Sequence, residues 1–408
     1  MKIIQREKRI AVIGAGIAGL YMTKLLLKKG YDVSIYEASN RIGGRIKEYQ
    51  FDHITVDLGG QWLHQFNDTP NSLTKIIQEA CQSYHRTSMY NGGQDKNEGT
   101  TVDSNQVESF ISYLRNMALD SDMSLSQSIR KFSTDPKLKS YFDAALVDMA
   151  SSSEEFSTKE FLKLLPALEP TDYELDDVSM GSLITDYFSD IPKERIMLST
   201  PIKIIRYDEE CIVLTTQNGE KANFAHAIVA VPISQLKNNS IQFIPQLPDE
   251  KRLAIQKIGM GSGLKVFFFF DEHILKKSAF AQQYAPYYIE RKIGRYVVII
   301  SIIMGHYAEK YYRNAVAYEE GMLDEISKLA ERDVRPLLKG LKFQDWTKEP
   351  FIEGTYSYPI PGEGNARAVA SSPLLNKIFF IGEAMNTNHA YGFIHGALET
   401  AEKVNTLF

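Results

Sequence analysis

A glycine-rich turn near the N-terminus constrains the fold of this chain more than any other sequence feature. A β-branched run at residues 9–13 precedes the turn, and apolar residues at helical spacing follow it up to Gly30, which is placed to end a helix. Residues 31–37 (YDVSIYE) read as a second strand. Strand, turn, helix and strand within about 30 residues predict a βαβ unit, and therefore a parallel sheet. The turn fits the pattern G-x-G-x-x-G over Gly14, Ala15, Gly16, Ile17, Ala18 and Gly19.

The positions of these glycines indicate a dinucleotide-binding site. Gly14 permits the tight turn, Gly16 lets the backbone approach a pyrophosphate, and Gly19 lets the helix pack closely on the sheet. The helix N-terminus offers unpaired N–H groups and a positive dipole end to phosphates. Glu37 ends the second strand, at the distance expected of a carboxylate that accepts hydrogen bonds from a ribose. An ordinary tight turn between a strand and a helix is the alternative.

The bulk composition excludes several classes of protein. At 408 residues the chain is too long for one ordinary core, so two domains are expected. An apolar content of 44% and a charged content of 24% are typical of a soluble globular protein. The net charge of −5 and the lack of a Lys/Arg-rich block argue against nucleic acid as a partner. Cys81 and Cys211 are the only cysteines, so no disulfide framework is expected.

The sequence also carries signals about location. The N-terminal residues run directly into the first predicted strand, without the apolar stretch and cleavage site of a secretory signal. The longest apolar runs, 266–270 and 296–304, are far shorter than the roughly 20 residues that span a bilayer. Two cysteines without a disulfide framework fit a reducing compartment. We therefore expect a cytoplasmic protein with no membrane partner, and the sequence leaves the oligomeric state open.

Residues 72–195 read as mainly helical. Glycine and asparagine interrupt this stretch at 91–99, within a predicted mobile loop over 91–105. Further breaks are expected at Pro166 and Pro170, because proline cannot continue a helix.

Strand patterns dominate the rest of the chain. Residues 196–232 read as several strands, and Asn218-Gly219 between two of them predicts a hairpin. Residues 264–270 (LKVFFFF) and 287–304 suggest a second sheet, the latter as a hairpin that turns near Ile293-Gly294. The last predicted elements are an amphipathic helix over 318–331, a strand over 378–381 and a helix from about Gly392.

A second glycine-rich segment, Arg-Ile-Gly-Gly-Arg at residues 41–45, follows the βαβ unit directly. Gly43 and Gly44 allow a ligand to approach the backbone closely, and Arg41 and Arg45 can donate to phosphate. A solvated surface pair of arginines is the alternative. From this point the chain resembles the flavin-containing amine oxidase superfamily, and the resemblance extends over nearly its whole length. It implies FAD as the cofactor.

The resemblance assigns further segments to the cofactor. Residues 57–64 (DLGGQWLH) are similar to the glycine-rich segment that passes along the flavin, and Ile204 falls where a residue packs by the adenine. Residues 379–384 (FFIGEA) resemble the stretch whose glutamate contacts the ribityl and phosphate region. Residues 393–397 resemble the helix start beneath the N1–C2 carbonyl edge of the flavin. The implied cofactor residues are Gly59, Gly60, Gln61, Trp62, Ile204, Gly382, Glu383, Phe393 and Ile394.

The resemblance also implies residues that take part in a reaction. Lys265 aligns with the lysine that amine oxidases hold near flavin N5 through a water, and a lysine beside four phenylalanines is costly to bury without partners. Tyr356 and Phe393 match the two walls of an aromatic cage that orients an amine. His64 matches a histidine near the substrate of polyamine oxidases. The alternatives are a strand-end lysine that reaches solvent, plain aromatic packing, and a structural histidine.

The alternation of these stretches, together with the resemblance, predicts an α/β fold of two domains. One domain is assembled from separated segments of the chain, and the second is inserted between them twice. An FAD-binding domain of Rossmann type is expected from residues 1–61, 196–240 and 346–408. An inserted α+β substrate-binding domain, with a mixed or antiparallel sheet and helices, is expected from residues 62–195 and 241–345.

Departures from the family pattern narrow the prediction. Thr355 stands where mitochondrial monoamine oxidases carry the cysteine that binds flavin covalently, so non-covalent FAD is expected. The long coiled-coil insertion and the extra N-terminal domain of the family's histone demethylases are not visible in the sequence, which argues against a nucleosomal role. No metal site is predicted.

The reaction implied is the oxidation of an amine. A hydride equivalent passes from the carbon next to nitrogen to flavin N5, and the resulting imine hydrolyses. Oxygen is the expected acceptor, giving hydrogen peroxide. The substrate must react as the neutral amine, so the rate should rise with pH. The alternatives are other flavin chemistry (L-amino-acid oxidation, or desaturation of the carotenoid and protoporphyrinogen oxidase type) and a non-catalytic FAD scaffold.

The identity of the amine stays open. A polyamine is favoured by His64 and, weakly, by the acidic run at 172–177 (DYELDD), which otherwise reads as a solvated loop. A monoamine is favoured by the aromatic pair. An amino acid would need an arginine aimed into the pocket for its carboxylate, and sequence alone cannot place Arg291 or Arg295 there.

Overall fold

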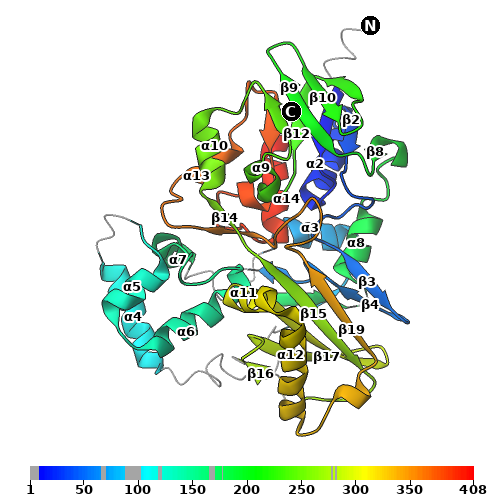
Figure 1. Ribbon diagram of the computed structural model, residues 1–408. Coiled ribbons are helices and arrows are strands. Elements are labelled where there is room, and N and C mark those ends of the chain that lie inside the picture. The colour runs from blue at the N-terminus through cyan, green and yellow to red at the C-terminus, as the bar shows by residue number, and fades with distance from the viewer. Residues whose placement is uncertain are drawn as a thin grey trace.

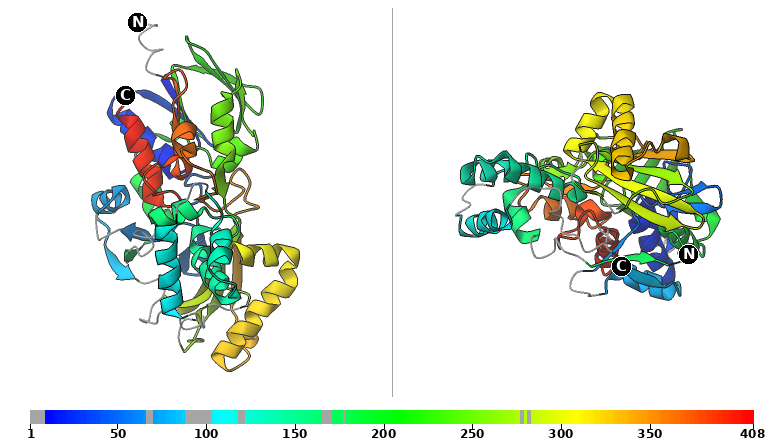
Figure 2. Two further views of the ribbon diagram at one scale, coloured as in Figure 1. Left: turned by 90° about the vertical axis from the view of Figure 1, so that its left-hand side faces the viewer. Right: turned by 90° about the horizontal axis from the view of Figure 1, so that it is seen from below.

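The computed structural model describes residues 9–65, 70–87, 103–117, 122–164, 171–176, 178–276, 279–280 and 283–408. The chain forms an upper body that holds the C-terminus, a lower body built on a sheet, and a helical lobe at one side (Figure 1). Figure 2 shows the lobe projecting away from the sheet of the lower body. None of the helices in the described ranges has both the length and the apolar content needed to cross a membrane.

A parallel sheet forms the centre of the upper body. In spatial order its strands are β21 (Ile378–Phe380), β12 (His226–Val229), β1 (Arg9–Ile13), β2 (Asp32–Tyr36) and β8 (Ile196–Met197). Ile10 and Val12 of β1 face one side of the sheet, whereas Ala11 and Ile13 face the other, as the alternation of a strand requires. The helices on the first side are α2 (Ile17–Lys28), α14 (Ile394–Asn405), α3 (Ser72–Glu79) and α8 (Met180–Tyr187).

A second sheet covers the opposite side. Its strands are β11 (Lys221–Phe224), β10 (Ile212–Thr216), β9 (Ile202–Tyr207) and β13 (Gln242–Ile244), with only the β13–β9 pair parallel. Gly219, with φ +86°, turns the chain between β10 and β11, which confirms the predicted hairpin. The helices that pack on this side are α9 (Ile233–Lys237), α10 (Asp249–Gln256) and α13 (Ala366–Ser371).

The lower body is an antiparallel sheet buried on both faces. Its strands are β16 (Ala279–Phe280), β17 (Tyr287–Ile293), β18 (Tyr296–Met304), β15 (Gly263–Phe270) and β19 (Gly340–Asp345). Phe268 and Phe270 of β15 pack with residues of α11 (His306–Arg313) and α12 (Ala315–Ala330). Phe267 and Phe269 pack against the hairpin β3 (Glu48–Phe51) and β4 (Ile54–Asp57). Because each face of β15 has a cover, the four consecutive phenylalanines are all buried.

Two smaller assemblies complete the chain. The lobe consists of α4 (Ser104–Asn116), α5 (Leu125–Phe132), α6 (Pro136–Ala145) and α7 (Thr158–Leu164). A three-stranded antiparallel sheet has the order β5 (Leu63–Gln65), β7 (Thr171–Leu175) and β6 (Tyr84–Thr87). Strand β14 (Ile258–Met260) pairs with β20 (Ser357–Pro359). Short 3-10 turns occur at Val147–Met149, Lys193–Arg195, Arg335–Leu337 and Glu383–Met385.

The structure confirms the mixed α/β fold, the βαβ unit and the hairpin at Ile293-Gly294. It corrects the prediction for 72–195, because that stretch also contains β6 and β7. The acidic run is not a loop: residues 171–175 form the central strand of the small sheet, where each neighbour supplies hydrogen bonds. Residues 91–102 of the expected mobile loop, with Pro166 and Pro170, lie outside the described residues, while Asp103 caps the start of α4.

The packing of four elements indicates where the boundaries between the two domains lie. We propose the two-domain division predicted from the sequence, with these four elements moved from one domain to the other. Apolar residues of α3 and α8 join the core on the α2 side of the parallel sheet, and those of β13 and α10 join the core on its other side. We therefore propose that these four elements belong with the dinucleotide-binding domain rather than with the inserted one.

Candidate active site

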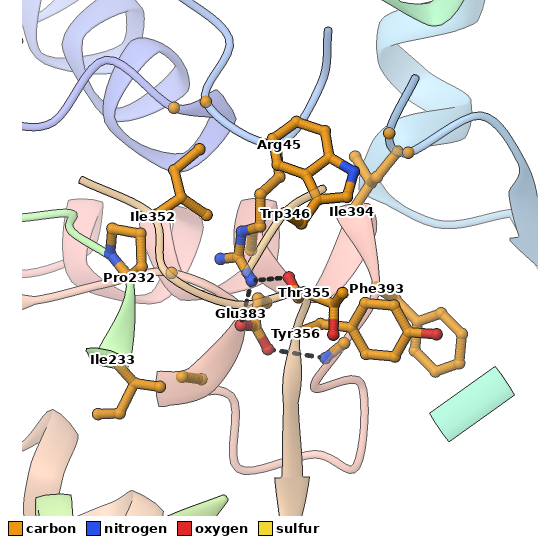
Figure 3. A pocket seen from close by; sticks show the side chains of 18 of the residues that line it. Arg45, Pro232, Ile233, Trp346, Ile352, Thr355, Tyr356, Glu383, Phe393 and Ile394 are labelled. Carbon is orange, nitrogen blue, oxygen red and sulfur yellow. Dashed lines mark hydrogen bonds and ion pairs between the residues drawn. The ribbon is translucent and has the colours of Figure 1, made fainter. Parts of the chain in front are cut away.

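A cavity of about 1150 Å³ runs between the upper body, the lower body and the lobe. The glycine half, as we name it, is lined by Gly14, Gly16, Glu37, Arg45 and Glu383. The aromatic half is lined by Trp62, His64, Lys265, Tyr356 and Phe393. Figure 3 shows the junction of the halves, where Arg45 and Glu383 meet the segments that carry Tyr356 and Phe393.

The glycine half begins at the turn between β1 and α2. Gly14 has φ +103°, which L side chains rarely adopt, and a Cβ there would lie 2.7 Å from the carbonyl oxygen of Ala230. Gly16 also lines the cavity, and a Cβ on it would meet no protein atom within 4 Å. The backbone at the start of α2 is therefore open to the cavity, where a phosphate would meet N–H donors.

Glu37 lies at the end of β2, on the wall of the same half. Its Oε2 accepts a hydrogen bond from Ala15 N at 2.6 Å, and its Oε1 accepts from Ser39 N and Ser39 Oγ at 2.8 Å. These donors fix the carboxylate, whose remaining lone pairs can accept from ribose hydroxyls. Gly43 N donates to Ala15 O at 2.8 Å, so the two glycine-rich segments are tied together.

Arg41 braces the segment in which it lies. Its Nη2 donates to Gly44 O at 2.6 Å and lies 3.6 Å from Glu349. Burial lowers the pKa of Arg41, and the Glu349 carboxylate opposes that effect. Arg41 remains on the cavity wall, so its charge still contributes to the potential there.

Arg45 and Glu383 form a buried ion pair between the halves. Arg45 Nη1 donates to Glu383 Oε1 and to Thr355 O, both at 2.8 Å (Figure 3). Glu383 is 6% exposed. Burial alone would raise the pKa of Glu383, but the Arg45 charge and the hydrogen bonds from Ser357 and Arg45 lower it. Glu383 is therefore ionised at neutral pH despite its burial.

Lys265 is buried, with 3% exposure, so the alternative that it reaches solvent from a strand end is wrong. Its Nζ also lies 4.8 Å from the ring centroid of Trp62. Burial lowers the pKa of Lys265 to about 8, while Asp57 and Glu174 act in the opposite direction. The ammonium donates to three oxygens: Asp57 O at 2.7 Å, Gln61 Oε1 at 2.7 Å and Gly59 O at 3.3 Å.

Tyr356 and Phe393 contribute rings to the aromatic half from two segments that project to the same side of Glu383 in Figure 3. Tyr356 Oη donates to Asp148 O at 2.6 Å, which fixes its ring. Burial raises the pKa of Tyr356 well above its usual value, so the hydroxyl stays protonated. The ring centroid of Phe393 lies 5.0 Å from that of His64 and 5.3 Å from that of His395.

Strand β7 supplies two carboxylates that the sequence did not single out as site residues. Asp172 lines the cavity, and its Oδ1 lies 2.7 Å from His64 Nδ1. Glu174 Oε1 accepts from Trp62 Nε1 at 2.7 Å and from Gln61 Nε2 at 3.2 Å. Glu174 thereby turns the Gln61 amide so that its oxygen faces Lys265. The pairing of β5 with β7 brings these residues together, so the acidic run in the sequence could only weakly indicate them.

The residues of the glycine half fit an FAD cofactor. No side chain among the described residues caps the N-terminus of α2, so its first N–H groups are free for a phosphate. A Cβ on Gly382 would meet open space, as at Gly16. A ligand therefore has room to lie against the backbone at both glycines. Gln235 Nε2 is buried at the cavity without a hydrogen-bond partner in the described part of the chain. Such an amide is a donor that a bound group would satisfy.

Most predicted site residues lie on the cavity wall, and three do not. Ala15 is fully buried, and it contributes only through its backbone bond to Glu37. Gly19 packs on the preceding turn, where a Cβ would collide with the carbonyl oxygen of Gly14. Ile204 is not on the wall, whereas Lys203 is, because the register between β9 and β10 shifts beside it. That a residue near Ile204 packs by an adenine stays a prediction.

Other wall residues come from stretches that carried no recognisable motif. The lobe and the 3-10 turn after α6 supply an apolar wall to the aromatic half. Two exposed arginines, Arg86 and Arg115, also line it. Arg291 lies 3.9 Å from Glu174, and Arg295 pairs with Asp52 on the surface. The apolar wall comprises Val107, Ile111, Phe142, Leu146, Met149 and Phe161.

Several relatives are similar to this chain over nearly its whole length. A probable polyamine oxidase 4 of Arabidopsis thaliana is 25% identical, over 96% of this chain and 85% of that protein. Polyamine oxidase 2 of the same plant is 26% identical, over 97% of this chain and 86% of that protein. A lysine-specific histone demethylase 1 homolog 2 of Oryza sativa subsp. japonica is 24% identical. This chain spans 55% of the length of that demethylase homolog.

Solved structures show the same fold. Putrescine oxidase bound to putrescine superposes with a TM-score of 0.81 at 16% identity, and 98% of each chain is covered. Cyclohexylamine oxidase from Brevibacterium oxydans IH-35A gives a TM-score of 0.82, also at 16% identity and 98% coverage of each chain.

Two family models match this chain. An NAD(P)-binding Rossmann-like domain matches residues 12–80, which contain the glycine turn and Glu37. The flavin containing amine oxidoreductase family matches residues 165–406, a stretch that contains Lys265, Tyr356 and Phe393 and makes up more than half of the chain. FAD is the cofactor that these matches imply. This chain therefore belongs to the family of flavin-containing amine oxidoreductases.

Proposed function

We propose that this chain is an FAD-dependent amine oxidase that oxidises the carbon next to an amine nitrogen. The observation that carries the proposal is the placement of Lys265, Tyr356 and Phe393 in one cavity with the glycine half. The glycine half has the donors and the open backbone that a dinucleotide needs. The aromatic half has two ring faces, which attract and orient an amine, and the buried Lys265 lies on the wall of the same cavity.

The chain's own residues would bind and orient the amine and exclude water from it. Bound FAD would supply the redox step, by accepting a hydride equivalent, after which water hydrolyses the imine. Tyr356 and Phe393 would hold the nitrogen between their faces, and Asp148 O would keep the Tyr356 ring in place. The apolar wall of the lobe would exclude water from the reacting carbon.

Two groups in the proposed reaction gain or lose protons, the amine substrate and Lys265. An amine that binds as a cation must lose its proton before its α-carbon can give up a hydride, so the rate should rise with pH through the pKa of the amine. Lys265 Nζ, held by three oxygens, would carry or pass a proton at the buried end of the aromatic half. Since burial brings the pKa of Lys265 down to about 8, both of its protonation states are accessible near neutral pH.

The finer part of the proposal is a substrate with a second cationic group, such as a diamine or polyamine. Asp148 and Asp172 line the aromatic half, and either carboxylate could pair with a distant ammonium. His64 beside Asp172 would orient that carboxylate. Polyamine oxidases among the relatives, and the putrescine named for one similar structure, support this reading.

Amino-acid oxidation is the second candidate. Arg86 and Arg115 both line the aromatic half, and a guanidinium could bind the carboxylate of an amino acid. Both arginines are exposed, which weakens their hold on an anion. The diamine reading therefore takes precedence.

The state of the cofactor and its acceptor are also proposals. Neither Cys81 nor Cys211 lines the cavity, and Thr355 offers no thiol for a thioether link, which supports non-covalent FAD. Release of all flavin by acid precipitation would agree with this, whereas flavin that stays in the pellet would contradict it. We take oxygen as the acceptor, with hydrogen peroxide as the product.

Anaerobic mixing of the FAD-loaded protein with a panel of amines tests the proposal. The panel holds spermine, N-acetylspermidine, putrescine, benzylamine, tyramine and several L-amino acids. Bleaching by the di- and polyamines supports the diamine reading, and bleaching by amino acids alone supports the second candidate. If nothing bleached while dithionite still reduced the flavin, amine oxidation would be ruled out for these classes. Admission of air with a peroxide assay then tests oxygen as the acceptor.

A further inference from the structure

We infer that Arg367, a residue of α13 outside the cavity wall, positions both rings of the aromatic half by acting through Ser357 and Glu383. The kinetic consequence of this inference rests on the proposed function. Its structural consequence, for the bound cofactor, does not.

Glu383 joins the two segments that carry the rings. Its Oε2 accepts from Ser357 Oγ at 2.6 Å and from Gly392 N at 2.9 Å. Ser357 directly follows Tyr356, and Gly392 directly precedes Phe393. One carboxylate oxygen therefore fixes the separation of the two backbones on which the rings are mounted.

Arg367 controls the hydroxyl group in this arrangement. Its Nη1 donates to Ser357 Oγ at 2.8 Å and to Ala384 O at 3.0 Å. A hydroxyl that accepts from a guanidinium must direct its own proton elsewhere, and here that proton goes to Glu383. Ser357 is fully buried and Arg367 is 5% exposed, so water does not compete for these bonds.

Arg367 also touches the second ring-bearing segment directly. Its guanidinium carbon lies 4.0 Å from the ring centroid of Tyr391, the residue before Gly392. Its Nε donates to Glu363 Oε1 at 2.7 Å, and this second buried carboxylate balances its charge. The guanidinium is therefore held from one side by Glu363 and contacts both ring-bearing segments on the other.

The chain offers a matched control for this residue. Lys251 is also a buried cation, at 2% exposure, and it is also anchored on α13. It contacts the opposite end of that helix and does not line the cavity. Its Nζ donates to the carbonyl oxygens of Val369, Ala370 and Ser372. Arg367→Met removes a buried cation of α13 and Lys251→Met removes a buried cation of α10 that contacts α13, but only the first change breaks the connection to Ser357.

The experiment compares the two variants with the wild-type chain, each loaded with FAD. With no amine present, the visible absorbance of the flavin and the FAD dissociation constant are measured. Arg367→Met should alter the flavin bands and raise the dissociation constant about tenfold, as expected for the loss of a charged hydrogen bond. Lys251→Met should lower the melting temperature and leave both readouts unchanged. Arg367→Lys, which keeps a cation, should recover part of the change.

Anaerobic reduction by an amine that bleaches the wild type adds the kinetic arm. Arg367→Met should raise the amine dissociation constant and slow the limiting rate of reduction, because both rings lose their fixed separation. Should Arg367→Met fail to fold, Ser357→Ala breaks the same connection and should change the flavin bands in the same way. Equal flavin bands and FAD affinity in Arg367→Met and Lys251→Met would overturn the inference. If no amine bleached the wild type, the proposed function would fail while the spectral arm still decided on Arg367.

Discussion

The two halves of the cavity are built in different ways. Most of the glycine half comes from two segments close in sequence, whose backbones are joined by the bond from Gly43 N to Ala15 O, and Glu383 adds a side chain from a distant segment. The aromatic half is formed by side chains from segments far apart, among them Trp62, Lys265 and Phe393. A site made of backbone tolerates few residue types, whereas a site made of side chains depends on the whole fold to bring them together.

This difference predicts how each half responds to substitution. Changes in the glycine half should abolish cofactor binding, because the ligand and the chain compete for the same space. Changes in the aromatic half should leave the cofactor bound and alter the reaction or the choice of amine. Each variant below tests that division.

The largest effect is expected in the glycine half, for Gly14→Ala. At φ +103° an alanine is strained, and its Cβ would lie 2.7 Å from Ala230 O, so the turn must move. We expect FAD affinity to fall by about 100-fold or more, measured by fluorescence titration. Gly30→Ala is the control, because Gly30 also has positive φ, at +80°, but a Cβ there meets nothing within 4 Å. Equal loss of FAD affinity in both variants would show that general destabilisation, and not the turn, explains the effect.

The next largest effect is expected for Lys265→Met in the aromatic half. We expect FAD to remain bound while flavin reduction or reoxidation slows by about 100-fold, as for loss of a preorganised charged group. Lys251→Met is the matched control, because burial also lowers the pKa of Lys251 to about 8 and its ammonium also has three oxygen partners. Stopped-flow absorbance separates the two half-reactions. An unchanged rate in both would remove Lys265 from the mechanism.

The same variant has a pH signature in stability. The pKa of Lys265 is about 8 in the folded chain, below the 10.5 of a free lysine, so the unfolded chain holds this proton more tightly. Between pH 8 and 10.5 the free energy of unfolding should therefore rise with pH in the wild type relative to Lys265→Met. Denaturant melts at several pH values measure the difference. A difference that stays constant over this range would mean that Lys265 titrates normally in the folded chain.

A smaller, selective effect is expected for Asp172→Asn. We expect about a tenfold rise in the dissociation constant of a diamine, with no change for a monoamine of the same length. Asp176→Asn is the control, because Asp176 also lies 2.7 Å from a histidine, His85, but on the exposed end of the same sheet. Equal weakening of diamine and monoamine would assign Asp172 to the fold and not to recognition.

The smallest effect is expected for Glu174→Gln. The amide oxygen can still accept from Trp62 Nε1, but the negative charge that orients the Gln61 amide is lost. We expect a rate change of less than about tenfold, with FAD affinity unchanged. Anaerobic reduction kinetics measure it. A loss as large as that of Lys265→Met would mean that Glu174, rather than Lys265, governs the buried end of the aromatic half.

The glycine half could be predicted from local sequence patterns, whereas the aromatic half could not. Gly14, Gly16 and Glu37 were identified because turn, helix and strand lie next to one another in the chain, and the structure places all three on the cavity wall. Tyr356 and Phe393 needed the family resemblance, since single aromatic residues carry no local signal. The place of Ile204 beside an adenine stays a prediction: Ile204 is off the wall, whereas its neighbour Lys203 is on it, beside the register shift between β9 and β10.

The site residues that could not be predicted from the sequence are those whose contacts depend on the tertiary fold, such as the pairing of strands. Asp172 and Glu174 read as part of a solvated acidic run, because nothing nearby shows that β7 lies between β5 and β6. Paired with β5, the same residues meet His64 and Trp62. The side-chain hydrogen bonds from Arg367 to Ser357 and from Ser357 to Glu383 also join residues that are apart in sequence, by 10 and 26 residues. Charged residues at such separations acquire partners only when the fold is complete.

The most direct test of the central claim is anaerobic reduction of the bound flavin by 1,4-diaminobutane and by butylamine, in the wild type and in Asp172→Asn. The account predicts that both amines bleach the flavin, that the diamine binds more tightly, and that the substitution removes only this preference. A flavin that neither amine reduces, although dithionite reduces it, would contradict the claim that the aromatic half holds an amine for oxidation.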